Sequence, residues 1–345
     1  MIDVLVVGAG PAGLATAIHC RQRGLSVTVL EQRAGPIDKA CGEGLMPATV
    51  QRLAAIGVVP PGRPFRGIRY LDARRLDDRY RADAAFRGGD GLGVRRTCLQ
   101  HSLAARAVQL GVAVAQTRVT GFAQDGCGVE VAGLRGRYLV AADGLHSTIR
   151  RACALDPAPA RRPRYGLRRH FRVAAWSDLV EVYWAHGSEA YVTPVDDGLV
   201  GVAVLGGDVG GFDTRLQAFP ALRDRLAGAQ PTGDVLGAGP LRQNVRRRVA
   251  GRVLLVGDAS GYVDALTGEG IGVALSQAAV LARCLAAQRP DDYEQAWLRV
   301  SRRARLLTGV LLWSRHRPLL APRIVPAAHR LPRLFSAIVN QVAQA

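Results

Sequence analysis

Apolar and polar residues follow a recognisable order over the first thirty residues of the chain. A short apolar run at residues 4–7 is typical of a buried strand, and a glycine-rich turn follows it directly. Apolar residues then recur at helical spacing over residues 14–23, and a second apolar run occupies residues 25–30. This order predicts a strand, a tight turn, a helix and a second strand, which is the βαβ unit of parallel α/β sheets.

The rest of the chain contains a second kind of pattern. Residues 99–110 have a helical pattern, whereas residues 119–140 alternate apolar and polar side chains as a β-meander does. Strand-like runs rich in β-branched and aromatic residues dominate residues 165–205. A buried strand at residues 253–256 and a long helix at residues 270–286 then return the chain to the first pattern.

These patterns predict an α/β fold with a Rossmann-like βαβ nucleotide-binding domain, an inserted antiparallel sheet and C-terminal helices. The length of 345 residues and the 48% hydrophobic content are sufficient for two domains. We expect the inserted sheet to form a substrate-binding domain. The predicted boundaries assign residues 1–70, 90–160 and 250–290 to nucleotide binding, residues 71–89 and 161–249 to the substrate sheet, and residues 291–345 to the C-terminal helices.

The glycine turn carries the first chemical signal. Gly8, Gly10 and Gly13 form a GxGxxG pattern between the first strand and the first helix. In this pattern the glycines permit the tight turn, the approach of a pyrophosphate and close helix packing. Glu31 ends the second strand, where a carboxylate accepts the ribose hydroxyls of an adenine dinucleotide. The sequence therefore predicts a dinucleotide site.

Two later motifs specify which dinucleotide. Asp-Gly at residues 143–144 and GDASGYVDALTGEGI at residues 257–271 each follow a strand-like run. With the glycine turn, Glu31 and Arg96, they make the chain similar, nearly end to end, to the FAD-dependent monooxygenase and geranylgeranyl reductase superfamily, which has the p-hydroxybenzoate hydroxylase fold. The resemblance implies one permanently bound FAD. NADH or NADPH would be a transient reductant, because no second dinucleotide signature occurs.

The same resemblance implies roles for individual residues. Asp258 would bind the ribityl or pyrophosphate portion of FAD, and Arg96 would contact the phosphate side. The start of the helix at residues 270–286 would offer backbone amides to the flavin ring, where a helix N-terminus favours negative charge. The complete set of predicted cofactor-binding residues is Gly8, Gly10, Pro11, Ala12, Gly13, Glu31, Gln32, Arg33, Cys41, Gly42, Arg96, Asp143, Gly144, Gly257, Asp258, Gly268, Gly270 and Ile271.

One cysteine is a candidate for the chemistry itself. The segment from Lys39 to Leu45 reads KACGEGL and resembles a ring-side segment of geranylgeranyl reductases and related monooxygenases. Cys41 would then either line the active site or act chemically, and a reactive thiol requires an accessible, electropositive setting. A loop that simply packs against FAD is the alternative. The six cysteines lack the spacing of zinc sites, so no metal is expected.

The substrate sheet departs from the prenyl reductases. Residues 189–194 read EAYVTP where those enzymes have YxWxFP. This difference argues against a prenyl-chain reductase. Tyr191, Pro194, Trp184 and His170 are the candidates for the substrate wall, although aromatic residues on a sheet are more often part of the core.

The charge of the chain changes the picture little. The formal net charge is +18, but Lys39 is the only lysine among 46 basic residues, which is typical of arginine use in a GC-rich genome. We therefore expect no nucleic-acid partner. Arginines lie among apolar residues near the C-terminus, so the C-terminal helices would either close over the core or contact a membrane surface. The first strand begins almost at Met1, which predicts a cytoplasmic protein, and the oligomeric state stays open.

The predicted function is that of an FAD-dependent oxidoreductase. We favour an NAD(P)H-dependent monooxygenase that hydroxylates an apolar phenolic or polyketide-like small molecule. A geranylgeranyl-reductase-like enzyme that reduces carbon–carbon double bonds of a prenyl lipid is the main alternative, and a non-catalytic flavin-binding protein of the membrane surface is an alternative of another class. A flavin-dependent halogenase needs a catalytic lysine well downstream of the glycine turn, and Lys39 cannot supply it.

Overall fold

The computed structural model describes residues 1–75, 80–156, 162–207 and 210–344. Its first layer is a sheet of the order β17-β18-β11-β1-β2-β8. Neighbouring strands from β18 to β8 are parallel, as expected from a βαβ unit. The strands are β1 (Ile2–Val7), β2 (Val27–Glu31), β8 (Ala113–Gln116), β11 (Leu134–Ala141), β17 (Val249–Ala250) and β18 (Val253–Leu255).

Three helices cover this sheet with apolar faces. They are α1 (Pro11–Arg21), α3 (Arg96–Gln109) and α7 (Gly270–Ala286), and α1 packs closely against both of the others. Leu14 and Ile18 of α1 share a fully buried cluster with Leu281 of α7. Burial of each such side chain contributes about 1.5–3 kcal/mol, so this cluster fixes the first helix under the glycine turn.

The predicted meander at residues 119–140 is only partly a meander. Strands β9 (Ala123–Gln124) and β10 (Val129–Val131) pair antiparallel with each other, and β10 pairs antiparallel with β11. The second half of β11 instead pairs in parallel with β1 and β18. It therefore lies at the centre of the nucleotide-binding sheet.

A seven-stranded sheet forms the other half of the molecule, as predicted. Its order is β16-β12-β15-β14-β13-β5-β6, and all neighbours are antiparallel except β13 and β5. β5 starts at Gly67, slightly before the predicted boundary at residue 71. The strands are β5 (Gly67–Asp72), β6 (Arg81–Ala85), β12 (Tyr165–Arg172), β13 (Val180–Trp184), β14 (Ser188–Asp196), β15 (Leu199–Gly206) and β16 (Gln230–Ala238).

Smaller elements complete the two halves. A three-stranded sheet has the order β3-β7-β4. In the described part of the chain, four short helices lie in the nucleotide-binding half or at the edge of the large sheet. These elements are β3 (Gly44–Leu45), β4 (Arg63–Phe65), β7 (Gly91–Gly93), α2 (Pro47–Ala55), α4 (Thr148–Ala152), α5 (Phe212–Leu216) and α6 (Pro220–Arg225).

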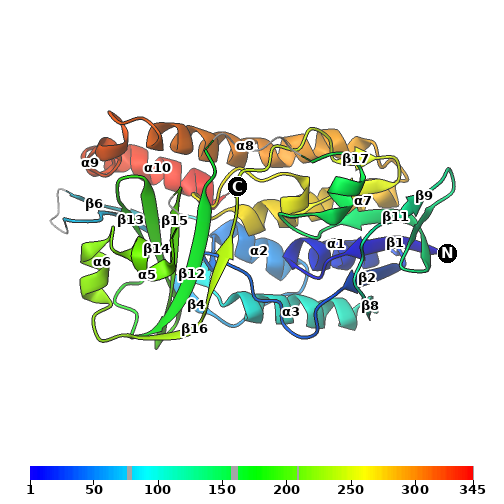
Figure 1. The fold of residues 1–345 in the computed structure, drawn as a ribbon, viewed down its shortest axis with the longest axis horizontal. Coiled ribbons are helices and arrows are strands. Elements are labelled where there is room, and N and C mark those ends of the chain that lie inside the picture. The colour runs from blue at the N-terminus through cyan, green and yellow to red at the C-terminus, as the bar shows by residue number, and fades with distance from the viewer. Residues whose placement is uncertain (76–79, 157–161, 208–209, 345) are drawn as a thin grey trace.

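The C-terminal helices connect the two halves. In Figure 1, α8 (Asp292–Arg315) runs along the molecule over both the nucleotide-binding half and the large sheet. α9 (Ile324–Arg330) and α10 (Pro332–Ala343) pack on β6. Phe335 of α10 stacks on Tyr70 of β5, with ring centroids 4.7 Å apart. In the described parts of the chain, every helix is too short or too polar to cross a membrane.

A buried ion cluster attaches α8 to the large sheet. Glu189 on β14 is completely buried and pairs with Arg315, the last residue of α8. Its other oxygen lies 2.6 Å from Arg164 Nη2, and Arg164 Nε donates to Asp264 at 2.9 Å. A buried charge is costly unless an opposite charge pairs with it. The pairing of Arg315 with Glu189 therefore fixes the position at which the end of α8 meets the large sheet.

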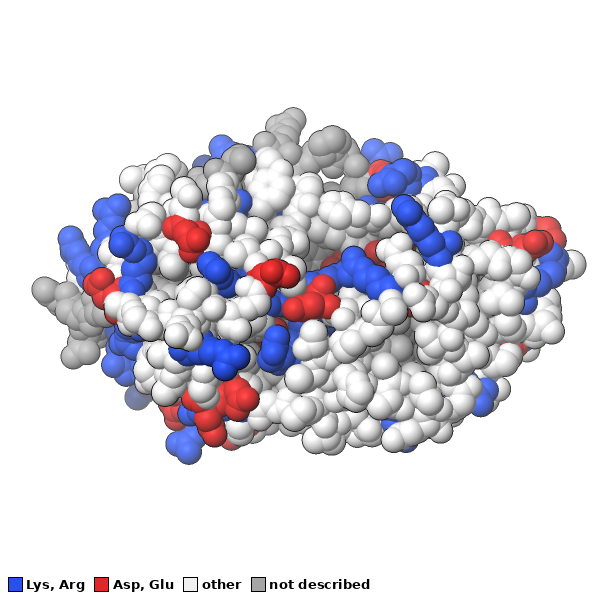
Figure 2. Space-filling view, turned by 60° about the horizontal axis from the view of Figure 1, so that its bottom comes forward, with Lys and Arg blue, Asp and Glu red and all other residues white. Residues whose placement is uncertain are grey.

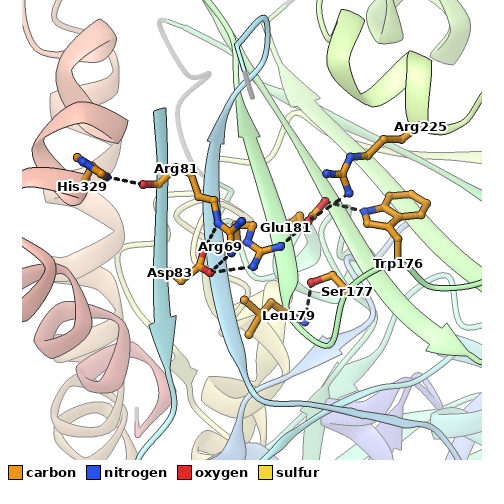
Figure 3. A network of polar contacts seen from close by, with 9 residues as sticks. All are labelled: Arg69, Arg81, Asp83, Trp176, Ser177, Leu179, Glu181, Arg225 and His329. Carbon is orange, nitrogen blue, oxygen red and sulfur yellow. Dashed lines mark hydrogen bonds and ion pairs between the residues drawn. The ribbon is translucent and has the colours of Figure 1, made fainter. Parts of the chain in front are cut away.

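A second network of polar contacts lies on the outer strands of the same sheet. Glu181 on β13 is buried and binds Arg69 Nη1 at 3.2 Å (Figure 3). Trp176 Nε1 and Tyr183 OH both donate to its second oxygen, at 2.9 and 2.7 Å. Arg69 also pairs with Asp83 of β6 at 2.8 Å, so this arginine of β5 links the carboxylates of its two neighbouring strands, β13 and β6.

We predict that Glu181→Ala lowers the free energy of unfolding by about 3 kcal/mol or more, because it leaves buried donors and a guanidinium without their acceptor. Thermal and denaturant unfolding of the purified protein measure the effect. The matched control is Asp178→Ala, since Asp178 is exposed and only weakly paired with Arg66. Equal stability of the two variants would contradict the prediction.

Candidate flavin and substrate site

The three glycines of the first turn do different things. A Cβ on Gly13 would lie 1.9 Å from the Gly8 carbonyl oxygen, and Gly8 itself has φ of +105° and would place a Cβ 2.5 Å from Ala142 O. These two positions need glycine for the turn itself. A Cβ on Gly10 would meet only Arg96 Nη2, at 3.8 Å. Gly10 therefore leaves free space where a ligand approaches the backbone.

Glu31 is held in place by the same turn. One of its carboxylate oxygens accepts from Ala9 N at 2.9 Å, and the other accepts from Arg33 N at 3.0 Å. An ionised carboxylate has about four acceptor positions, so the fixed group keeps capacity for further donors. Glu31, Gln32 and Arg33 line the large cavity described below. This arrangement fits the ribose hydroxyls of an adenine dinucleotide.

Charged side chains surround the middle of this site. Arg96 is buried at the start of α3, and its Nη1 has no hydrogen-bond partner among the described residues. Burial lowers the pKa of Arg96 and also that of Lys39, which lies close to Asp258. Burial raises the pKa of Asp258, although Lys39 and Arg96 oppose this. An anion such as a pyrophosphate would satisfy the unpaired guanidinium.

The loop of residues 38–43, which we call the cysteine loop, lies against the same cavity. Cys41 lines the cavity, and Glu43 N donates to its Sγ at 3.4 Å. Burial raises the pKa of the Cys41 thiol, and the charge of Arg96 only partly offsets this. The thiol is therefore protonated at neutral pH, which does not suit a thiolate nucleophile.

Glu43 holds this loop, a role that the sequence did not reveal. The residue is buried and has φ of +59°, a conformation that costs a non-glycine residue free energy. Its Oε1 accepts from Arg96 N at 2.9 Å, and its backbone carbonyl accepts from Val94 N at 2.8 Å. Its Oε2 lies 2.6 Å from His170 Nε2 on β12. One side chain thus links the loop, the start of α3 and the large sheet.

The contacts of His170 define its tautomer. His170 Nδ1 lies 2.9 Å from Arg168 Nη1. Because arginine can only donate, Nδ1 must accept, and Nε2 carries the proton that it donates to Glu43. Arg168 also pairs with Asp38, at the beginning of the cysteine loop. The network therefore clamps both ends of the loop onto β12.

Of the four residues predicted for the substrate wall, one lines the cavity and three do not. Tyr191 lines the cavity and donates its hydroxyl to Leu266 O at 2.6 Å. Trp184, Pro194 and His170 are not among the described residues that line it. Trp184 packs against Tyr70 in the core, with centroids 5.1 Å apart, and His170 lies behind the cysteine loop. Thr193 does line the cavity, and its hydroxyl donates to Gly42 O at 2.7 Å.

One cavity of about 1720 Å³ connects the glycine turn, the cysteine loop and Tyr191. Every predicted cofactor-binding residue except Gly13 lines it. Figure 2 shows one face that is hollowed near its middle, where basic and acidic side chains lie close together. At its other end the cavity runs between the large sheet and the C-terminal helices. The residues of α8 to α10 that line it are Leu306, Leu307, Val310, Leu311, Ser314, Ile324, Ala327, Ala328, Leu331, Leu334, Phe335, Ile338, Val339 and Val342.

The fold and this site define an FAD-dependent oxidoreductase with a p-hydroxybenzoate hydroxylase-like architecture, as the sequence predicted. A model of the family described as "FAD binding domain" matches residues 1–199, so the chain belongs to this family. Its cofactor is FAD, and NADH or NADPH is the reductant typical of the family.

Two relatives resemble most of the chain. The digeranylgeranylglycerophospholipid reductase 1 of Methanothermobacter thermautotrophicus is 28% identical, covering 85% of this chain and 81% of that protein. The menaquinone reductase of Mycobacterium tuberculosis is 28% identical, covering 98% of this chain and 89% of that protein. The solved structure of a flavin-dependent brominase matches with a TM-score of 0.84 at 17% identity, covering 100% of this chain and 94% of that one. At that identity the brominase shows the fold alone.

We predict that Gly10→Val folds but binds FAD at least about tenfold more weakly, a loss of about 1.4 kcal/mol, because the new side chain fills the space left for the pyrophosphate. Flavin absorbance per protein and a titration followed by flavin fluorescence measure the loss. Gly121→Val is the control, since a Cβ at Gly121 meets nothing within 4 Å. A Gly10→Val protein with unchanged FAD affinity would refute this assignment.

We also predict that Glu43→Gln destabilises the protein by about 2 kcal/mol and weakens FAD binding. Glutamine has one acceptor oxygen, whereas the His170 and Arg96 donors need one each, so a buried donor loses its partner. Thermal unfolding and FAD titration test this, with the exposed Glu130→Gln as the matched control. If Glu43→Gln melts and binds FAD like the control, the loop does not depend on this carboxylate.

Proposed function

We propose that this protein reduces carbon–carbon double bonds in the prenyl chain of a lipid. The observation that carries the proposal is the continuity of one cavity from the dinucleotide loops to an apolar passage under α8 and α10. Drug-sized ligands occupy pockets of about 300–1,000 Å³. A cavity of about 1720 Å³ leaves room for an elongated substrate beside a dinucleotide.

The lining of the passage favours a hydrocarbon chain over a compact phenol. Among the described residues that α8, α9 and α10 contribute, Ser314 is the only one with a polar side chain. A phenol needs a positioned polar partner for its hydroxyl, because an unpaired polar group is costly to bury. A prenyl chain has no such group and gains free energy by burial at about 25 cal/mol per Å².

The two relatives support the same choice. Both names specify the reduction of a molecule that carries prenyl chains, and both proteins resemble this chain over most of its length. The difference at residues 189–194 from the prenyl reductases argued against a prenyl-chain reductase. In the structure, Tyr191 and Thr193 of this segment line the cavity, and their hydroxyls donate to Leu266 O and Gly42 O. The protons of both hydroxyls are thus already donated to backbone carbonyls, and they are not free for a phenolic substrate.

The chemistry requires few groups from the protein. Bound FAD, once reduced by a hydride from NADH or NADPH, would supply a hydride for one carbon. The second carbon needs a proton, and the protonated Cys41 thiol is the candidate donor beside the ring site. The apolar passage aligns the double bond and excludes water from the reacting carbons.

The test uses the FAD-loaded protein without oxygen, with NADH, NADPH or dithionite and a geranylgeranyl lipid or a menaquinone. We expect products heavier by two hydrogen atoms for each saturated bond in mass spectrometry. The FAD-deficient Gly10→Val variant is the negative control. Products that appear only with oxygen and carry label from ¹⁸O₂ would instead establish the monooxygenase.

Cys41→Ser and Cys41→Ala separate proton donation from packing. We expect Cys41→Ala to keep FAD and its reduction by the nicotinamide while losing product formation at least about tenfold. Cys41→Ser should retain part of the product formation, because serine keeps an exchangeable proton. Full product formation by Cys41→Ala would exclude the thiol as the proton donor.

A further inference from the structure

The last part of the chain has an unusual charge. Residues 295–345 contain nine arginines and neither aspartate nor glutamate. One of the nine, Arg315, is buried and paired with Glu189. Arg317, Arg323, Arg330 and Arg333 are exposed around α9 and the ends of its neighbours. The segment contains no acidic residue that would offset these exposed arginines, so it presents a positively charged surface.

The same segment exposes most of the large apolar side chains on the surface. Fourteen large apolar residues are exposed among the described residues, and nine of them lie in this segment. Those of α8 follow helical spacing and so share one face, as do Leu334 and Ile338 of α10. Six of the nine form what we call the C-terminal apolar face, namely Leu306, Val310 and Trp313 of α8, Leu331 directly before α10, and Leu334 and Ile338 of α10.

The C-terminal apolar face surrounds the end of the cavity. Five of its six members, all except Trp313, also line the cavity. Leu306 is 61% exposed and Leu334 is 55% exposed although each of them lines an internal passage. Side chains that are both exposed and cavity-lining mark an opening. The apolar passage thus opens through an apolar, positively charged surface.

We propose that the C-terminal apolar face docks on an anionic lipid bilayer. A cluster of exposed apolar side chains at the mouth of a cavity is typical of an interaction site. A second copy of the chain would bring two arginine-rich rims together, which like charges oppose. A bilayer with anionic headgroups attracts the same rim, and the exposed Trp313 suits the membrane–water interface. Charge and apolarity together select the bilayer.

Docking would bring the opening of the passage to the lipid. A prenyl chain could then slide from the bilayer into the passage without exposure to water, and its reactive bonds would reach the flavin end. This entry route rests on the proposed function, whereas docking itself rests only on the surface. The two are therefore tested by separate measurements.

Co-sedimentation with vesicles tests docking on the full-length, FAD-loaded protein. The vesicles contain phosphatidylcholine alone, or phosphatidylcholine with about one third phosphatidylglycerol. We expect binding at least about tenfold stronger to the anionic vesicles, and a decrease with added salt. Brominated lipids should quench tryptophan fluorescence in the wild-type protein but not in Trp313→Phe, which removes the exposed indole.

Two double variants separate the apolar and basic contributions. Leu334→Ser with Ile338→Ser should weaken binding to both kinds of vesicle, whereas Arg330→Ser with Arg333→Ser should remove most of the preference for anionic vesicles. Val108→Ser, which changes an exposed apolar residue on α3, is the control and should bind like the wild type.

Other results would overturn the proposal. Failure to bind either vesicle, or binding that neither double variant changes, excludes docking through this face. A dimer in light scattering that Leu334→Ser with Ile338→Ser converts to monomers would assign the face to a second copy instead. If docking occurs but prenyl lipids are not reduced, the docking site stands and the proposed function fails. If detergent-solubilised lipid is reduced but vesicles are not bound, the proposed function stands and docking fails.

Discussion

The buried carboxylate of Glu43 is the link on which the arrangement of the site depends. It satisfies the backbone at the start of α3 and the imidazole of His170 with one side chain, at 2.9 and 2.6 Å. Its left-handed backbone turns the cysteine loop, and glycine, which adopts that conformation more easily, could not supply the carboxylate. The protein therefore accepts local strain in order to hold the flavin-side loop against the large sheet.

The second constraint acts at the other end of the cavity. Arg315, the last residue of α8, pairs with Glu189 inside the large sheet. This pair fixes the distance between the end of α8 and the sheet. Phe335 on α10 packs on Tyr70 of β5. Together these contacts keep the C-terminal helices close enough to the sheet to enclose a passage, while their outer faces stay exposed. The flavin site and the apolar opening are thus two ends of one cavity.

Much of the fold followed from the sequence because its signals are local. The glycine turn, the helix at residues 270–286 and the inserted sheet all rest on periodicity or on short motifs. Glu43 was not recognised, because its importance arises from His170, 127 residues away in the chain. His170 and Trp184 were expected at the substrate wall, but aromatic and polar residues on a strand can face either side. The passage itself depends on helices whose packing no local pattern specifies.

In the proposed function, one continuous cavity holds a prenyl chain between the flavin and the C-terminal helices. Photo-crosslinking measures this directly, with a geranylgeranyl lipid that carries a diazirine at the far end of its chain. We expect labelled peptides from residues 306–314 and 331–342 in the FAD-loaded protein, with loss of label when unlabelled lipid is in excess. Label confined to residues that do not line the cavity, or label that unlabelled lipid fails to displace, would contradict it.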